Sequence, residues 1–351
     1  MSRTVHSPSR ARVLGWLVAL AVGVTSGSAA VTDAAAARRE SPFHPRPFRA
    51  EADGRWLGDA IAYGPHRDGQ RPGGVSPTRA QVREDLALLA RHWGLLRIYG
   101  AAGTGDTVLA AIRDSGLPIK VVLGLWLAAE DRRDSTGRVL ERFPAARRAN
   151  RLEIAAAARL VKRDRGTIVA VTVGNETQVF WSGNRLPAGR LIDYLRDLRA
   201  RVPVPVSTAD DYNFWNKPES RAVAMECDFV FAHLHPLWNG TSLADAVPWI
   251  ERQYTAICAV HPDRDVVVGE TGWATRHNDQ GDQGKLMKGA VGEAEQAVFM
   301  RELRSWLSRS HVTTFTFEAF DENWKGSPDP DEVEKHWGLY RADRTPKRTM
   351  E

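Results

Sequence analysis

Two stretches decide the fold: Thr167-Ile-Val-Ala-Val-Thr-Val-Gly-Asn-Glu176 and Val266-Val-Val-Gly-Glu-Thr-Gly-Trp273. Each begins with a short run rich in β-branched residues and reaches a glycine, the pattern of a fully buried parallel strand. Each run leads directly into a glutamate, Glu176 in the first stretch and Glu270 in the second. A carboxylate at the C-terminal end of such a strand projects from the face where barrel enzymes do chemistry. The two stretches therefore predict paired carboxylates at one end of a parallel barrel.

Working outward, the chain contains eight strand candidates in all. They are residues 60–63, 95–99, 119–125, 168–173, 204–207, 229–233, 266–268 and 313–317. Helical patterns lie between most of them: Val82, Leu86, Leu89 and Trp93 share one face, as do Phe299, Leu303 and Trp306. Pro144 and Pro187 stand where helices should start. We therefore predict an α/β fold, a single (β/α)₈ TIM barrel over residues 51–351.

An open doubly wound sheet is the rival fold, and it usually carries a glycine-rich phosphate loop after its first strand. Here Gly64-Pro65 follows the first strand, and Gly103-Thr-Gly105 lacks both the third glycine and the P-loop lysine. Nucleotide binding has no support, and we expect no cofactor.

The first 37 residues have the composition of a secretory signal peptide. Three arginines (Arg3, Arg10 and Arg12) precede an apolar run over residues 13–24, and small residues follow it. Cleavage is expected between about residues 30 and 37, and residues 38–50 are predicted to be a linker or N-terminal extension. The run is too short to span a bilayer comfortably, so we expect a secreted or periplasmic protein without a stable membrane anchor.

The charge and the cysteines exclude some partners and leave one question open. The formal net charge is +5, and the three arginines of the leader account for much of it. Because no basic cluster is interleaved with aromatic residues, we expect no nucleic-acid partner. We also expect the protein to be a monomer. Cys227 and Cys258 can be read equally well as a disulfide or as two buried thiols.

The paired glutamates suit the cleavage of a glycosidic bond, which needs one carboxyl group as proton donor and another as nucleophile or base. Glu176 and Glu270 fall on the fourth and seventh strands, nearly opposite each other across the barrel. In a retaining enzyme the two carboxyl groups are roughly 5 Å apart. Asn175 could bond a sugar hydroxyl, and Trp273 could stack on a sugar ring. Several tryptophans lie beside predicted strand ends and suit a carbohydrate cleft: Trp126, Trp181, Trp215, Trp238, Trp273 and Trp324.

Together these motifs resemble bacterial members of glycoside hydrolase family 17, a group of β-1,3-glucanases, over almost all of residues 56–340. The matching segments are Ile61-Ala-Tyr-Gly-Pro-His-Arg-Asp-Gly-Gln70, Arg97-Ile-Tyr-Gly100, Val173-Gly-Asn-Glu176, Gly269-Glu-Thr-Gly-Trp273, Phe317-Glu-Ala-Phe-Asp-Glu-Asn-Trp-Lys325 and His336-Trp-Gly-Leu-Tyr340.

The resemblance implies a division of roles. Glu176 would be the general acid/base and Glu270 the nucleophile, acting through a covalent glycosyl–enzyme, with Asn175 on the 2-hydroxyl. Four further residues align with positions that surround the reacting sugar: Tyr63, Tyr99, Glu322 and Lys325. From the residues themselves we also expect His233, Trp273 and Trp324 to bind substrate. The pair Glu322 and Lys325 makes chemical sense, because a lysine near two carboxylates can hold one of them ionised.

Two departures from the family pattern stand out. Ile98 replaces an expected threonine, and the segment His233-Leu-His-Pro-Leu-Trp238 differs between its His and Trp. His233 and His235 also allow a metal interpretation, but no third ligand is evident and we expect no metal. Glu318 and Asp321 could be a supporting layer or simple loop acids.

The function expected from this set is a retaining glycoside hydrolase acting on β-glucan, with β-1,3-linked glucan as the expected polysaccharide or oligosaccharide substrate. A β-1,3-glucanosyltransferase would use the same two glutamates, and a non-catalytic glucan-binding barrel is the third alternative. Linkage, endo or exo action, and hydrolysis against transfer are not decided by the sequence.

Overall fold

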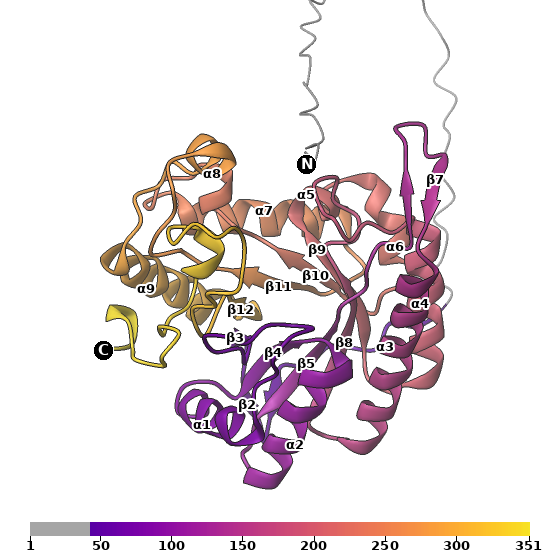
Figure 1. Ribbon diagram of the computed structural model, residues 1–351, viewed down its shortest axis with the longest axis horizontal. Helices are drawn as coiled ribbons and strands as arrows, with labels where there is room; N and C mark the ends of the chain where they lie inside the picture. The colour runs from indigo at the N-terminus through magenta and orange to yellow at the C-terminus, as the bar shows by residue number, and fades with distance from the viewer. Residues whose placement is uncertain (1–42) are drawn as a thin grey trace, which may run out of the picture. The chain divides into compact units, whose positions relative to one another are not determined.

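Eight parallel strands close into a barrel in the computed structural model, which describes residues 43–351 (Figure 1). In chain order the strands are β3 (Asp59–Tyr63), β4 (Leu95–Tyr99), β5 (Lys120–Leu125), β8 (Ile168–Asn175), β9 (Val206–Asp211), β10 (Val230–His233), β11 (Val266–Thr271) and β12 (Thr314–Thr316). Each pairs with the next, and β12 pairs with β3 to close the ring. The predicted TIM barrel is confirmed, and each of the eight strand candidates overlaps a barrel strand.

Helices surround the strands (Figure 1). The longer ones are α1 (Arg79–Leu89), α2 (Asp106–Ser115), α3 (Pro144–Arg163), α4 (Ala188–Arg201), α7 (Ala246–Val260) and α9 (Glu293–Ser310). Three short ones, α5 (Tyr212–Trp215), α6 (Arg221–Ala224) and α8 (Gly281–Leu286), lie in the loops. Thr78 and Gln81 form a capping box that starts α1. Pro144 opens α3 as predicted, whereas Pro187 occupies the N-cap of α4.

The barrel has a filled interior that is separate from its outer core. Each strand contributes one inward residue to the inner cluster: Ala60, Leu95, Val122, Ala170, Ala209, Phe231, Val267 and Phe315. The larger cluster, which includes Ile61, Ile98 and Leu123, packs the outer side of the strands against the helices. Because side chains fill the barrel, any catalytic groups must lie above this layer, at the strand ends.

Residues 43–50 pack against the opposite end of the barrel. The Phe48 ring stacks on Phe229, with centroids 4.8 Å apart, and Arg46 forms an ion pair of 2.9 Å with Asp228. A small hairpin of β1 (Glu51–Ala52) and β2 (Arg55–Trp56) follows. The described part of the predicted linker is therefore a docked extension. The predicted signal peptide lies outside the described residues.

Other features differ from expectation or settle an open point. β9 runs four residues further than predicted, to Asp211, and a hairpin of β6 (Asp131–Arg133) and β7 (Val139–Arg142) was not foreseen. Cys227 and Cys258 are free thiols. Within residues 43–351, no helix combines the length and the apolar character needed to cross a membrane.

Candidate active site

Both glutamates lie at the carboxyl edge of the barrel, as the sequence predicts. Glu176 directly follows β8, the fourth barrel strand, and Glu270 lies in β11, the seventh. The end of β8 pairs irregularly with β9, and both Gly174 (φ 82°) and Glu176 (φ 50°) have positive φ. A side-chain-bearing residue in this conformation costs about 1–3 kcal/mol, and such strain concentrates at functional sites. This conformation therefore supports a functional role for Glu176 independently of its charge.

Glu270 is buried and held by donors on both of its oxygens. Its Oε1 accepts hydrogen bonds from Arg97 Nη1 (2.6 Å) and from the Tyr99 hydroxyl (2.8 Å), and its Oε2 lies 3.2 Å from His235 Nε2. Burial by itself would raise the pKa of Glu270, but the positive charges around it, those of Arg97 and His235 among them, outweigh it and hold the pKa well below its usual range. Glu270 is therefore ionised in the way a nucleophile requires.

Arg97, on β4, is one of the residues of the site that the sequence did not predict. Besides Glu270, its guanidinium donates to Asn175 Oδ1 (2.7 Å) and to the carbonyl of Gly269 (3.1 Å), and it is 1% exposed. Arg97 is part of the quoted motif Arg97-Ile-Tyr-Gly100, but the motif alone does not show what the arginine binds. The available signal was its charge: a buried guanidinium requires a buried carboxylate.

Two histidines on the sixth strand and its loop contact the glutamates. His233 Nδ1 lies 3.0 Å from Glu176 Oε1, and its Nε2 lies 3.5 Å from Glu270 Oε1. His233 is fully buried and lies beneath the carboxylates. The predicted contact between His233 and a sugar is therefore wrong. Burial lowers the pKa of His235, but its hydrogen bond to Glu270 outweighs this and the pKa is raised overall.

A lysine and two further glutamates form a second charged group after β12. Lys325 Nζ lies 2.7 Å from both carboxylate oxygens of Glu318 and 2.9 Å from Glu322 Oε2. Burial raises the pKa of Glu318 well above its usual value, and the charge of Glu322 adds to this. Glu322 is buried too, but Lys325 and His66 outweigh the burial and lower its pKa to about 2. This agrees with the prediction that the lysine keeps one of two carboxylates ionised.

Three more acids near Glu176 were not predicted. Asp210 and Asp211 are the last residues of β9 and lie beyond the predicted end of that strand at residue 207. Burial raises the pKa of Asp210 to about 8 and that of Asp211 to about 6, and the charge of Glu176 contributes to both shifts. Glu334, in the loop after β12, has a raised pKa because of burial, with contributions from Glu176 and Glu270. The acid/base candidate is thus surrounded by further carboxyl groups.

Tyr63 does not reach the site. Its ring is 0% exposed and its hydroxyl donates to Asp85 of α1 (3.0 Å), on the outer side of the barrel. Tyr63 is level with Ile98 in the β3–β4 pairing, and Ile98 packs in the outer core. Because level residues on paired strands face the same side, Tyr63 points away from the cleft while Tyr99 points into it.

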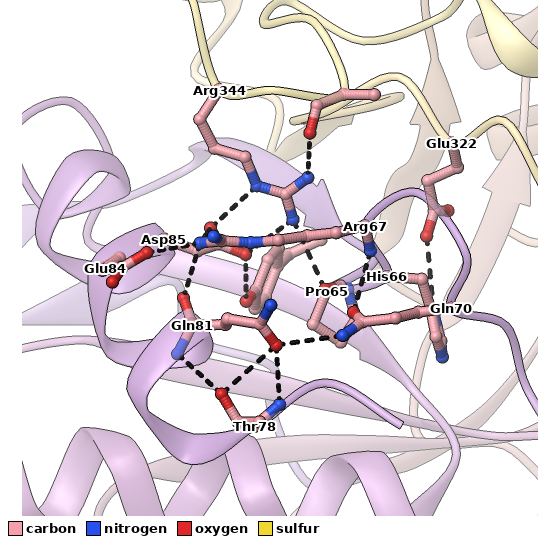
Figure 2. Close-up of polar contacts among 12 residues, drawn as sticks. Pro65, His66, Arg67, Gln70, Thr78, Gln81, Glu84, Asp85, Glu322 and Arg344 are labelled. Atoms are coloured by element: carbon pink, nitrogen blue, oxygen red, sulfur yellow. Dashed lines mark hydrogen bonds and ion pairs between the residues drawn. The ribbon is translucent and has the colours of Figure 1, made fainter. Parts of the chain in front are cut away.

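Asp85 is the centre of a polar network that holds the loop after β3 (Figure 2). Its carboxylate also accepts from Arg67 (2.9 Å) and twice from Arg344 (2.8 Å each). Arg344 Nη2 bonds the carbonyl of Pro65 (3.3 Å), and the next residue, His66, lies 3.4 Å from Glu322. Tyr63 therefore supports the site from outside through this loop.

The predicted tryptophan cluster divides into exposed and buried members. Trp273 is 1% exposed, stacks on Phe299 of α9 and donates from Nε1 to Ala290 O (2.9 Å). It therefore packs between strand and helix, and no face remains for a sugar. Trp215 is also buried. Trp126, Trp181 and Trp324 are 50%, 48% and 39% exposed, and Trp324 is fixed by a bond from Nε1 to Glu322 (3.0 Å).

The fold and the site define a class: a TIM-barrel glycoside hydrolase with a carboxyl pair at strands four and seven. A family model described as the BtgE/BtgC glycoside hydrolase domain matches residues 60–338, so the chain belongs to this family. The predicted kinship with glycoside hydrolase family 17 is confirmed.

Named relatives and solved structures agree with this assignment. A glucan 1,3-beta-glucosidase of Schizosaccharomyces pombe is 27% identical over 76% of this chain and 79% of its own length. A putative glucan endo-1,3-beta-glucosidase, btgC, of Aspergillus niger is 27% identical over 77% of this chain but only 40% of its own length. An endo-laminarinase from Formosa has a TM-score of 0.71 at 22% identity, covering 84% and 86% of the two chains. A family 17 beta-1,3-glucanosyltransferase from Rhizomucor miehei has a TM-score of 0.64 at 21% identity, covering 83% and 95%.

Proposed function

We propose that this chain is a retaining glycoside hydrolase of β-1,3-linked glucan, with Glu270 as nucleophile and Glu176 as general acid/base. One observation carries the assignment of roles: the two glutamates flank a single imidazole, His233, but lie in different surroundings. Glu270 is 8% exposed and receives Arg97, Tyr99 and His235, whereas the Glu176 side chain is 29% exposed. Two carboxyl groups close together in unlike environments are what double displacement requires.

In the first step Glu270 attacks the anomeric carbon as the bond to the leaving oxygen breaks and that oxygen takes the proton of Glu176. Arg97 and Tyr99 hold Glu270 Oε1, and this leaves Oε2, beside His235, as the attacking oxygen. Arg97 also engages the amide oxygen of Asn175, so the amide nitrogen is the group that can donate to the sugar 2-hydroxyl. These residues perform the chemistry without a cofactor.

In the second step Glu176 removes a proton from the molecule that releases the sugar from Glu270. A water molecule gives hydrolysis, and a sugar hydroxyl gives transfer to a second glucan. Both outcomes use the same two glutamates, and the names of the relatives include hydrolases and a glucanosyltransferase.

Product analysis tests the proposal. The purified protein is incubated with β-1,3-, β-1,6- and mixed-linkage glucans, and products are followed by chromatography, with the anomeric configuration followed by NMR. We expect products from the β-1,3-glucan with retained β-configuration. Inverted products, or binding of glucan without any reducing sugar or transfer product, would contradict the assignment. Products longer than the substrate would identify a transferase.

We also propose that the enzyme is exported and acts as a monomer without a stable membrane anchor; the N-terminal sequence, which has the signal-peptide pattern, supports export. N-terminal sequencing of the protein recovered from the native host tests export, and its expected start lies between about residues 30 and 37.

A further inference from the structure

Among residues 43–351, His233 is the one side chain that touches both catalytic glutamates while remaining fully buried. It ends β10, level with Glu270 on one side and with Asp211 on the other. A histidine that no substrate can reach acts only through its neighbours. Its two ring nitrogens therefore need to be assigned.

The contact with Arg97 determines which ring nitrogen carries the proton. Arg97 Nη1 lies 2.9 Å from His233 Nε2. Since a guanidinium nitrogen can only donate, Nε2 must accept, and the ring proton is left on Nδ1. The Nδ1–H group then donates to Glu176 Oε1 at 3.0 Å. The ring is thus a neutral link that runs in one direction, from Arg97 through His233 to Glu176.

We propose that His233 is a positioning residue that assigns the acid proton of Glu176 to Oε2 and stabilises the carboxylate formed when that proton leaves. The inference rests on the proposed function and extends it. Since Oε1 already accepts the Nδ1–H bond, Oε2 is the oxygen that can carry the transferable proton.

The proton balance is simple. In the first step the Oε2 proton passes to the leaving glycosidic oxygen while Glu270 bonds to the sugar carbon. Glu176 becomes a carboxylate, and the bond from Nδ1–H strengthens because its acceptor is now charged. In the second step Glu176 regains a proton from water or from the acceptor sugar. His233 keeps its own proton throughout.

The charged and titratable groups around His233 come from five elements of the barrel edge. They are Arg97 of β4, Glu176 after β8, Asp211 of β9, His235 after β10 and Glu270 of β11. Among the described contacts of His233, only Glu176 bonds Nδ1. A change made at Nδ1 alone therefore isolates the proposed role.

Two matched substitutions separate the two ring nitrogens. His233→Asn places an amide near the Nδ1 position and keeps a donor for Glu176. His233→Gln reaches towards the Nε2 position, where its amide oxygen can accept from Arg97, and it leaves Glu176 without the donor. We expect His233→Gln to lower kcat/KM on glucan about tenfold and to move the basic limb of its pH profile up by about one unit, because an unassisted carboxylate forms less readily. An aryl glucoside with a good leaving group should lose much less.

The result expected for His233→Asn is a basic limb at its wild-type position. Equal loss on both substrates with no movement of the limb, or the same movement in both variants, would overturn the proposal. If His233→Gln does not fold, the unaltered protein still decides: ¹⁵N NMR of the histidine rings, assigned with His233→Asn, should show the Nδ1–H tautomer at the pH optimum. An Nε2–H or doubly protonated ring refutes the proposal. The NMR measurement needs no substrate, so a failure of the glucan assay alone points to the proposed function instead.

Discussion

Glu270 illustrates how single residues divide the work of the site. A carboxylate that is almost removed from water would ordinarily protonate, yet three donors, two on β4 and one in the loop after β10, keep this one charged. Glu176 has one bond from a neutral imidazole and keeps more exposure to solvent. Because both residues are glutamates, their hydrogen-bond partners and their exposure determine which one is the nucleophile and which one is the acid.

Replacing the nucleophile should abolish turnover without unfolding the protein. Glu270→Gln keeps an acceptor oxygen for Arg97 and Tyr99 but cannot form the glycosyl–enzyme, so we expect kcat on laminarin-type glucan to fall roughly 10³-fold or more. Glu84→Gln is the control, because Glu84 is 66% exposed on α1 and should leave kcat unchanged. Circular dichroism checks the fold, and near-normal turnover of a folded Glu270→Gln would exclude the nucleophile role.

Replacing the acid should affect substrates unequally. Glu176→Ala removes the proton that a sugar leaving group needs, whereas an aryl glucoside with a good leaving group needs little help in the first step. We expect kcat/KM on glucan to fall about 10²- to 10⁴-fold and on the aryl glucoside far less. The comparison is made by initial rates on both substrates, and an equal loss would argue against an acid role for Glu176.

At the scale of elements, the barrel strands were the predictable part, and their ends were not. Apolar runs with β-branched residues mark buried strands, so all eight were found. The polar stretch Thr208-Ala-Asp-Asp211 makes the predicted β9 too short, but these residues are buried at the strand end, where Asp211 lies level with His233. Tyr63 and Tyr99 both end strands, and only the register between β3 and β4 shows that they face opposite sides. A sequence gives the strand but not the register.

The end of β9 should make stability depend on pH. The pKa of Asp210, about 8 in the folded protein because of burial, lies above the value of about 3.9 for an unfolded aspartate. The folded state therefore holds a proton that the unfolded state has lost, and stability falls as pH rises from about 4 to 8. Asp210→Asn cannot ionise, so its melting temperature should gain on the wild type between pH 5 and 8. A constant difference across this range would mean that Asp210 is already ionised in the folded protein.

The Asp85 network should be a major source of stability for the first loop. Asp85→Ala removes the shared acceptor of Tyr63, Arg67 and Arg344 and leaves buried donors unpaired, which we expect to cost about 3–5 kcal/mol of unfolding free energy. Its neighbour Glu84 also pairs with Arg67 but is 66% exposed, so Glu84→Ala should cost less than about 1 kcal/mol. Urea unfolding measures both, and similar losses in the two variants would show that burial of the network is unimportant.

For the whole molecule, the motifs and their order were sufficient to predict the barrel and the position of the glutamates. The surroundings of the pair were harder, because Arg97, Asp211 and His235 come from separate strands and loops and meet only when the barrel closes. Trp273 shows the reverse error: its place in a motif suggested a sugar contact, yet the fold packs it against Phe299. Motif membership shows that a residue matters, and the three-dimensional contacts show why.

The loops after the last three strands line an open cavity that should bind glucan away from the glutamates. Its volume is about 400 Å³, within the range of ligand sites. Trp238 lines it together with the exposed Gln280 and Asp282, a combination that can stack on a sugar ring and bond its hydroxyls. Trp238 follows His235 by three residues in the chain, so one loop supplies a residue to the site and another to the cavity lining.

Chain length is therefore the variable that tests this cavity. Trp238→Ala should raise KM for long β-1,3-glucan oligosaccharides about tenfold, because aromatic contacts of this kind contribute about 0.5–1.5 kcal/mol beyond the area they bury. It should leave kcat/KM for the shortest cleaved oligosaccharide nearly unchanged, because that substrate does not reach the cavity. Trp238→Phe keeps an aromatic face and should recover most of the affinity. Michaelis–Menten kinetics over an oligosaccharide series decides the matter: a loss that is the same at every length would place Trp238 at the reacting sugar, and no loss at any length would leave the cavity outside the glucan path.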